Sequence, residues 1–305
     1  MAERPDLDYW VPWLARDLPG ARIARVQVDK PVVLRVVIRG SFEDLVTGRR
    51  VERVGRRGNF VLFHLAAEAD APAIDLAISC MLAGRFRFVE PSPKPKLPGD
   101  RAVSFFLEDG RVLVYRDDVQ MGKVYVLEAG AWATVPGLEK IGVDCLDRKK
   151  FTLKAFLALA KTRRDQAKVF LMDKAALDFF GNAYADEALF EARIHPKAFV
   201  RSLDQEALAR LHAAIVKTLD DARRIIHERK PPLDEKLRDF LSVRLHAGEP
   251  CPRCKTRIRK AGVHGHDAFF CPTCQPDARG STIVDWRKLG GAGDGSPPGE
   301  GSGAT

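Results

Sequence analysis

The 305-residue sequence predicts an α+β protein: an N-terminal helix and β-sandwich, then a helical domain, and last a β-hairpin that carries cysteine pairs. Two observations predict this class. Short segments rich in β-branched and aromatic residues occupy the chain to about residue 143, and an apolar repeat at helical spacing begins near residue 147. We therefore expect domains at 1–143, 144–245 and 246–288, followed by a disordered tail at 289–305.

The first domain is predicted to begin with one helix, because an apolar stripe over residues 8–14 is followed by the stop signal Leu18-Pro19-Gly20. Strands are expected wherever β-branched and aromatic residues gather between Gly or Asp turns, namely at 21–28, 31–38, 59–65, 73–79, 101–107 and 111–115. Several short strands in succession favour a sandwich.

The second domain is predicted to be helical. Its apolar residues recur at helical spacing in a first stretch and in a later, longer one, with Leu153, Phe156, Leu157 and Leu159 in the first and Leu208, Leu211, Ile215 and Leu219 in the second. Beyond Lys288, glycine, proline and serine dominate, and such a segment has too few apolar groups to form a core.

The charge balance favours a polyanionic partner. The chain has 50 Lys and Arg against 41 Asp and Glu, a formal net charge of +9, and basic surfaces bind phosphates through counterion release. The sequence has no apolar run of about 18 residues, so no membrane span is expected. Its polar, acidic N-terminus does not resemble a signal peptide. We expect a cytosolic protein, in which Cys80 and Cys145 are packing residues.

Two CxxC pairs near the C-terminus predict one structural Zn²⁺. Their spacing suits two turns that close on a single tetrahedral metal, with ligands Cys251, Cys254, Cys271 and Cys274. Four thiolates leave no position for water, so the metal organises the fold. Paired disulfides or a redox CxxC are the alternative. Between the pairs, residues 256–260 and 268–270 are expected to form a basic hairpin with its tip at 262–267.

One long segment carries a family resemblance. Residues 180–196, Phe-Gly-Asn-Ala-Tyr-Ala-Asp-Glu-Ala-Leu-Phe-Glu-Ala-Arg-Ile-His-Pro, resemble the helix-two-turn-helix motif of the formamidopyrimidine-DNA glycosylase and endonuclease VIII family. Residues 168–173 look like the segment that precedes this motif, and Gly248-Glu249-Pro250-Cys251 looks like the family's entry into its zinc finger. The order of the domains is also similar.

The resemblance implies a base-excision DNA glycosylase, with an added β-elimination lyase activity at abasic sites. Its partner would be double-stranded DNA that contains a damaged base or an abasic site. The protein would act as a monomer, in the cytoplasm and associated with the nucleoid. Family members attack the sugar with the α-amine left by removal of the initiator methionine, which here is that of Ala2. An α-amine has a pKa near 8, so part of it is a neutral nucleophile at neutral pH. Glu3 would be the acid, and Asp6 a further acidic position.

The resemblance also implies a set of DNA contacts. Lys168 and Asn182 would touch phosphates, the latter at a helix start. Asn59 stands where the family has a lysine near the reacting nucleotide, and Arg57 is the cation that could replace it. His266 stands where the family has an arginine that grips phosphates.

Met81 matches one of the positions that fill the hole left by an extruded base. Met121 lies in a stretch where the family commonly has arginine and phenylalanine, and its apolar side chain would still enter the base stack. The alternative function is a catalytically inactive or specialised relative that binds damaged DNA without cutting it, which Ala2, Asn59 and His266 favour. A zinc-ribbon protein that binds RNA or another protein is a third possibility, against which the 180–196 segment argues.

Overall fold

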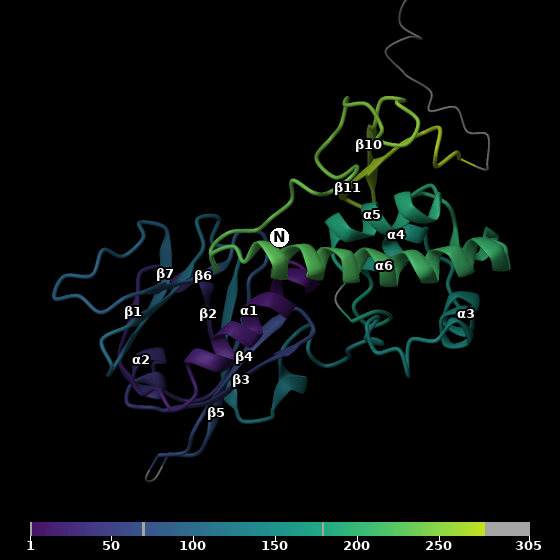
Figure 1. The fold of residues 1–305 in the computed structure, drawn as a ribbon. Helices are drawn as coiled ribbons and strands as arrows, with labels where there is room; N and C mark the ends of the chain where they lie inside the picture. The colour runs from purple at the N-terminus through teal and green to yellow at the C-terminus, as the bar shows by residue number, and fades with distance from the viewer. Residues whose placement is uncertain (1, 69–70, 179, 278–305) are drawn as a thin grey trace, which may run out of the picture.

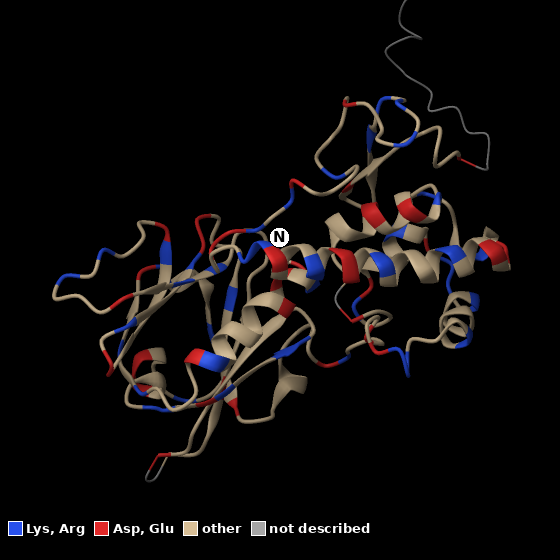
Figure 2. Cartoon of the chain, in the orientation of Figure 1, with Lys and Arg blue, Asp and Glu red and all other residues tan. Residues whose placement is uncertain are grey.

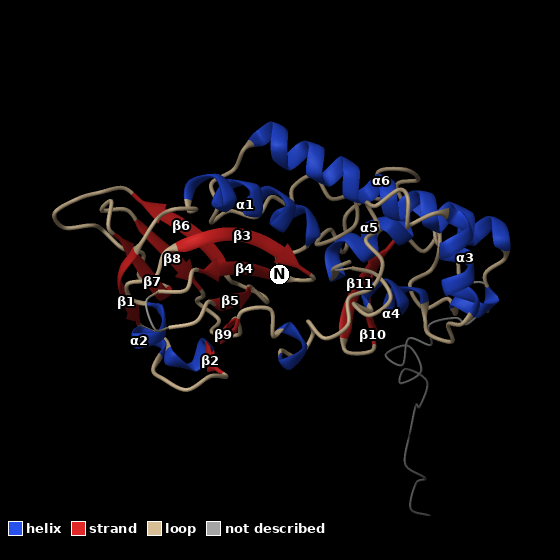
Figure 3. Cartoon of the chain, turned by 90° about the horizontal axis from the view of Figure 1, so that it is seen from below, coloured by secondary structure: helices blue, strands red, loops and turns tan. Residues whose placement is uncertain are grey.

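The computed structural model describes residues 2–68, 71–178 and 180–277. It has two parts, which Figures 1 and 3 show side by side: strands form one part and helices the other, with helix α1 (Arg4–Asp17) at their junction. The predicted α+β class and its order of elements are confirmed. No helix among the described residues has the length and apolar character needed to cross a bilayer.

Two sheets form the predicted sandwich. The four-stranded sheet has the order β1-β7-β8-β6, with β1 (Ile23–Val28), β7 (Arg101–Leu107), β8 (Val112–Arg116) and β6 (Arg85–Val89). The five-stranded sheet has the order β2-β9-β5-β4-β3, with β2 (Leu34–Val36), β9 (Lys123–Glu128), β5 (Ile74–Ser79), β4 (Phe60–Leu65) and β3 (Val51–Arg57). All pairs are antiparallel except β2 with β9.

The core of this part lies between the two sheets and beneath α1. Phe86 of one sheet and Phe63 of the other face each other with ring centroids 6.0 Å apart, and Trp10 of α1 meets Phe86 edge to face at 6.1 Å. All three are buried. Burial of such aromatic rings is the main favourable term in fixing the sandwich and seating α1 on it.

The prediction of a strand at 31–38 is largely wrong. Pro31–Val33 forms a 3-10 turn, and only β2 pairs, through three residues. Proline has no N–H to donate to a ladder, so the segment starts to pair only after it. A short helix α2 (Phe42–Val46) follows, and a second 3-10 turn (Trp132–Thr134) lies after β9.

The helical part contains α3 (Leu153–Lys161), α4 (Ala167–Met172), α5 (Asn182–Ala192), a 3-10 turn (Val200–Ser202) and α6 (Gln205–Arg229). Their apolar faces form a second hydrophobic cluster, which includes Phe156, Tyr184 and Leu211. Asp204 caps α6, because its side chain accepts the N–H of Ala207. Along α6, Figure 2 shows both signs of charge, as expected for a solvated helix face.

The strands of the C-terminal hairpin differ from the prediction: the first is shifted from 256–260 toward the tip, and the second is longer than 268–270. β10 (Arg259–Val263) and β11 (His266–Phe270) pair from Arg259–Phe270 to Val263–His266. The turn is therefore His264-Gly265 alone, with φ of +45° and +78°. Two successive left-handed residues make the tight turn that matches strand twist. The expected tip at 262–267 was too wide.

A buried cluster of ion pairs joins the two parts. Arg4 of α1 binds Asp8 at 2.8 Å and Asp178 at 3.3 Å, and Arg56 of β3 binds Asp178 at 2.7 Å. Asp178 precedes α5 in the chain, so the cluster fixes the start of α1 beside the approach to α5. Breaking one member of such a buried pair leaves an uncompensated charge, which is why the junction is held firmly.

Candidate active site and DNA interface

The N-terminal residues lie against the start of α5. Glu3 is 2 % exposed, and its carboxylate accepts the N–H of Ala183 at 2.9 Å and the N–H of Tyr184 at 3.2 Å. These N–H groups belong to the first turn of α5, where they have no partner inside the helix. The acid of the N-terminal segment is thereby held by the motif that the sequence singled out, about 180 residues away.

Gly181 makes this approach possible. A Cβ at Gly181 would lie 2.2 Å from the Cδ of Glu3 and 2.3 Å from its Oε2. The backbone of Gly181 has φ −89° and ψ 177°, an extended conformation that any residue adopts. The glycine is therefore needed for space and not for its conformational freedom.

Burial raises the pKa of Glu3, and the nearby charge of Asp6 raises it further. Arg238 and the two N–H groups of α5 act in the opposite direction, and the net pKa is still raised. A carboxyl with a raised pKa keeps its proton closer to neutral pH, which is the state that a general acid needs.

Asp6 is the second buried acid of the segment, and it positions Glu3. One of its oxygens accepts the N–H of Glu3 at 2.7 Å. Arg238 binds the same carboxylate with both terminal nitrogens, at 3.0 Å and 2.6 Å, and its guanidinium lies 5.5 Å from the ring centre of Tyr184. Such a two-bond ion pair fixes orientation as well as charge. Sequence reasoning missed Arg238, whose segment has no periodicity that marks it.

Residue 2 is buried beside these acids. Ala2 is 3 % exposed and belongs to the hydrophobic cluster of the sandwich. Since Glu3 contacts α5 directly, its neighbour Ala2 lies at the junction between the sandwich and the helical part, as Figure 1 shows for the start of the chain. Its catalytic role stays a prediction.

The two predicted phosphate contacts at the helix start differ in their surroundings. Asn182 is the first residue of α5, and its side-chain oxygen is buried with no hydrogen-bond partner among the described residues. Lys168 is fully buried, bonds to Asp186, and donates to the backbone oxygen of Asp267 in β11 at 2.7 Å. In this structure Lys168 fixes the hairpin to α5, and its phosphate contact stays a prediction.

The β3–β4 turn holds the next two predicted residues. Asn59 is 7 % exposed and donates to the hydroxyl of Ser79 at 2.9 Å. The guanidinium of Arg57 lies 4.9 Å from the ring centre of Trp132 and donates to the backbone oxygen of Leu138 at 3.4 Å. These contacts occupy Arg57 on the outer face of the sheet. The DNA contacts of Arg57 and Asn59 stay predictions.

The remaining predicted DNA contacts lie on loops and on the hairpin. Met81 is half-buried with φ of +40°, and Met121 is 44 % exposed. His266 is exposed at the start of β11. Figure 2 shows Lys and Arg on strand β10 of this hairpin, where Lys260 pairs with Asp267 of β11 at 2.9 Å.

The four cysteines converge as the spacing predicted. Their sulfur atoms all lie within 4.8 Å of one another, with Cys254 and Cys271 at 3.4 Å and Cys251 and Cys274 at 3.9 Å. Tetrahedral zinc with Zn–S bonds of about 2.3 Å places sulfurs about 3.8 Å apart, so the site fits this metal. Gln275 anchors the site to the helical part, because its amide donates to the backbone oxygen of Ile194 at 2.9 Å.

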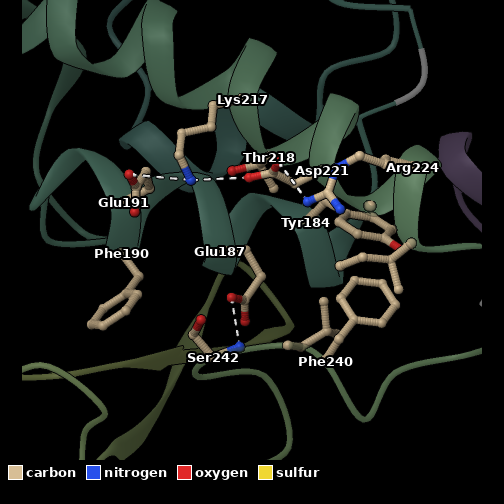
Figure 4. Close-up of a pocket in the computed structure, with 13 residues that line it drawn as sticks. Tyr184, Glu187, Phe190, Glu191, Lys217, Thr218, Asp221, Arg224, Phe240 and Ser242 are labelled. Carbon is tan, nitrogen blue, oxygen red and sulfur yellow. Dashed lines mark hydrogen bonds and ion pairs between the residues drawn. The ribbon is translucent and has the colours of Figure 1, made fainter.

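A cavity of about 180 Å³ lies between α5 and α6, lined in part by Tyr184 and Phe240. Figure 4 shows Glu187 turned toward the backbone of Ser242 and Lys217 placed between two carboxylates, at 3.6 Å from Glu191 and 3.0 Å from Asp221. Lys217 is thus paired with the two carboxylates, and Glu187 accepts backbone N–H groups. Neither Glu3 nor Asp6 lines the cavity, so it is separate from the acids at the N-terminus.

Family models match the chain in three consecutive blocks. Residues 1–124 match the formamidopyrimidine-DNA glycosylase N-terminal domain, residues 141–228 match the H2TH domain of the same enzyme, and residues 248–276 match the zinc finger found in FPG and IleRS. The formamidopyrimidine-DNA glycosylase of Heliobacterium modesticaldum is 32 % identical over 287 residues, which cover 90 % of this chain and 100 % of the relative. The chain belongs to the formamidopyrimidine-DNA glycosylase family. A second family member, from Pelotomaculum thermopropionicum, is 30 % identical over 284 residues, covering 90 % of this chain and 99 % of the relative.

Solved structures of the formamidopyrimidine-DNA glycosylase family share the fold. The MutM (Fpg) protein from Thermus thermophilus is 28 % identical and superposes with a TM-score of 0.73, covering 90 % of this chain and 98 % of that one. The Lactococcus lactis Fpg in complex with abasic-site DNA is 23 % identical with a TM-score of 0.77, covering 90 % and 100 %. The predicted family is confirmed, and so is one structural Zn²⁺ at the four cysteines. The domain limits at 143, 245 and 288 stay predictions, and the tail at 289–305 lies outside the described residues.

Proposed function

We propose that this protein is a DNA glycosylase of base-excision repair that also cleaves abasic sites by β-elimination. The observation that carries the proposal is the contact between Glu3 and the first turn of α5, which joins a buried acid of raised pKa to the helix-two-turn-helix motif. The relatives that match over almost their whole length bear the name formamidopyrimidine-DNA glycosylase, and one fold neighbour is a complex with abasic-site DNA. The substrate is double-stranded DNA with a damaged base or an abasic site, in the nucleoid of the cytoplasm.

The chemistry follows from two neighbouring residues. With Met1 removed, the neutral α-amine of Ala2 attacks C1′ of the flipped nucleotide, and the base leaves with the electron pair of the glycosidic bond and takes up the proton that the amine releases. The bond between C1′ and the ring oxygen then breaks, which leaves a Schiff base between C1′ and the nitrogen of Ala2. Glu3 supplies the proton to the ring oxygen as the ring opens. Asp6 holds the backbone of Glu3, and Arg238 holds Asp6, so the acid keeps one orientation throughout.

DNA is bound by groups on both sides of the junction. Asn182 donates its amide to a phosphate at the start of α5, and His266 approaches a second phosphate from the zinc hairpin. Met81 and Met121 enter the space vacated by the extruded nucleotide, where apolar contact replaces lost base stacking. The proposed set of DNA contacts is completed by Arg57 and Asn59 on the β3–β4 turn and by Lys168 beside the hairpin.

A trapping assay tests the proposal. The purified protein, with Met1 removed, is mixed with duplexes that contain an oxidised base or an abasic site, and borohydride is added to reduce any Schiff base. We expect base release and a covalent protein–DNA adduct. Lesion-selective binding with no adduct and no base release on any lesion would instead support a damaged-DNA-binding relative without catalysis.

A variant that retains Met1 is the first control, because it blocks the amine of Ala2 without changing a side chain. Trapping should disappear in this variant. Glu3→Gln separates the two catalytic roles, since it should impair release of a base more than adduct formation at a site that has already lost its base.

A further inference from the structure

Two loops at one end of the sandwich pack against the same side chain, that of Tyr115. The hydroxyl of Tyr115 is buried, and a Cβ at Gly84 would lie 2.5 Å from it and a Cβ at Gly122 only 1.8 Å from it. Gly84 belongs to the loop 80–84 between β5 and β6, and Gly122 to the loop 117–122 between β8 and β9. Each loop needs a glycine at this position, because Tyr115 fills the space that a side chain would occupy.

The two loops are also braced to each other. The carboxylate of Asp117 accepts the N–H of Gln120 at 3.0 Å and the N–H of Gly122 at 2.7 Å, which closes the second loop. Arg85 donates to the backbone oxygen of Ala83 in the first loop at 3.2 Å and lies 3.5 Å from Asp118 in the second. The pair behaves as one unit, which we call the apolar loop pair.

Large apolar side chains are held in solvent by this unit. Leu82 is 49 % exposed, Val119 is 50 % exposed and Met121 is 44 % exposed. A rigid loop that keeps several such side chains in water is typical of a surface that another molecule covers. The sequence pointed to Met81, but Leu82 is the more exposed residue of the first loop.

Lys236 reaches this unit from the helical part of the molecule. Its ammonium donates to the backbone oxygen of Leu82 at 3.1 Å, across 154 positions of the chain. Burial lowers the pKa of Lys236, and the charged or titratable groups around it are Cys80, Asp6, Arg238 and Arg85. Asp6 is close enough to stabilise the ammonium, yet forms its own ion pair with Arg238.

Lys236 and Arg238 thus lie two residues apart in the segment after α6, and each binds a different part of the molecule. Arg238 holds Asp6, which binds the backbone of Glu3, and Lys236 holds the backbone of the apolar loop pair. One short segment therefore connects the proposed acid to the proposed wedge. A shift of this segment moves both anchors together.

We propose that Lys236 is a positioning residue for nucleotide extrusion: by holding the carbonyl of Leu82, it couples insertion of the apolar loop pair into the base stack to assembly of the Arg238–Asp6–Glu3 chain. The inference rests on the proposed function, and it adds Leu82 to the residues that fill the vacated space. A charge-assisted bond to a carbonyl is strong enough to act as such a coupling, and an apolar group at position 236 removes it.

The test uses Lys236→Met, Lys236→Arg and, as a matched control, Lys230→Gln. Lys230 is an exposed lysine six positions upstream, at the end of α6, and it takes no part in the proposed site. Extrusion is followed by stopped-flow fluorescence of a 2-aminopurine placed beside the lesion, and base release is followed in single turnovers. We expect Lys236→Met to slow extrusion about tenfold, equivalent to about 1.4 kcal/mol, Lys236→Arg to restore most of the rate, and Lys230→Gln to match the wild type.

Binding to undamaged duplex and the thermal unfolding midpoint separate positioning from stability. Both should stay unchanged in Lys236→Met. A wild-type extrusion rate in Lys236→Met would overturn the inference, and so would a parallel loss of extrusion, undamaged-DNA binding and thermal stability, because that pattern indicates a structural lysine. Failure of the proposed function looks different. The wild-type protein itself would then release no base and form no covalent adduct, whatever effect the substitutions at Lys236 have on the 2-aminopurine fluorescence.

Discussion

Replacing Gly181 by alanine changes one methyl group and tests the contact on which the proposed chemistry depends. The extended backbone at Gly181 accepts alanine without strain, so the substitution acts through space alone. The new Cβ would lie 2.2 Å from the Cδ of Glu3, 2.3 Å from its Oε2 and 2.5 Å from its Cγ. Non-bonded heavy atoms cannot come this close to a Cβ, so the carboxyl of Glu3 has to leave the start of α5.

The loss can be estimated from the bonds that break. Glu3 gives up hydrogen bonds from the N–H groups of Ala183 and Tyr184. Hydrogen bonds to a neutral carboxyl contribute about 0.5–1.5 kcal/mol each, and a misplaced general acid forfeits a factor of about 100 to 10,000 in rate. We therefore expect Gly181→Ala to lower the rate of base release by at least about 100-fold.

The assay compares two substrates in single turnovers. In the proposed mechanism, release of an oxidised base needs both the amine of Ala2 and the proton of Glu3, whereas imine formation at an existing abasic site depends less on the acid. Gly181→Ala should thus reduce base release far more than borohydride trapping at an abasic site. Affinity for a duplex with an abasic-site analogue should change only severalfold, because the backbone of the motif is kept.

Gly55→Ala in β3 is the control, since a Cβ at Gly55 meets no atom within 4 Å. It should behave as the wild type. If Gly181→Ala released base at the wild-type rate, the contact between Glu3 and α5 would have no part in catalysis, and our assignment of the acid would have to be abandoned.

Three further outcomes are expected. Removing zinc with a chelator, or replacing Cys271 by alanine, should unfold the hairpin and abolish tight binding of lesion DNA, while circular dichroism reports an intact sandwich. Arg238→Met should destabilise the fold by about 3–5 kcal/mol in urea titrations, because it leaves Asp6 buried without its cation, and Asp6→Asn in the same background should recover part of that loss. Burial alone raises the pKa of Asp75, but hydrogen bonds from His64, Gly130 and Trp132 outweigh it and the net pKa is lowered. A folded-state pKa below the unfolded value of about 3.9 gives stabilisation that is present above that pH and lost as the pH falls through the folded pKa. The difference in unfolding free energy between wild type and Asp75→Asn should therefore be largest near neutrality and shrink toward pH 3; an unchanged difference would contradict this assignment.

Elements with strong local signals were predicted well from the sequence. The cysteine pairs carry their geometry in their spacing, and α6 carries an apolar repeat over its 25 residues. β3 was harder, because Val-Glu-Arg-Val-Gly-Arg-Arg is mostly polar and takes its strand form from pairing along β4. β6 and β9 have alternating or β-branched patterns that should have marked them as strands.

The candidate site shows the limit of sequence reasoning more clearly. Glu3 and Asp6 could be named from resemblance, but their surroundings come from residues that are about 180 and 232 positions away, Ala183 and Arg238. Gly181 lies within the 180–196 segment that carries the resemblance, but nothing in that segment shows that Glu3 packs against it. Contacts of this kind arise only when the two parts of the fold meet, so no local pattern contains them.

The most direct test of the account is to locate the covalent adduct in the protein. After borohydride trapping on abasic-site DNA, the protein is digested with protease and nuclease, and the peptide that carries the sugar remnant is sequenced by mass spectrometry. We expect the remnant on the α-nitrogen of Ala2 and on no lysine side chain. A remnant on a lysine, with the amino terminus unmodified, would contradict the mechanism.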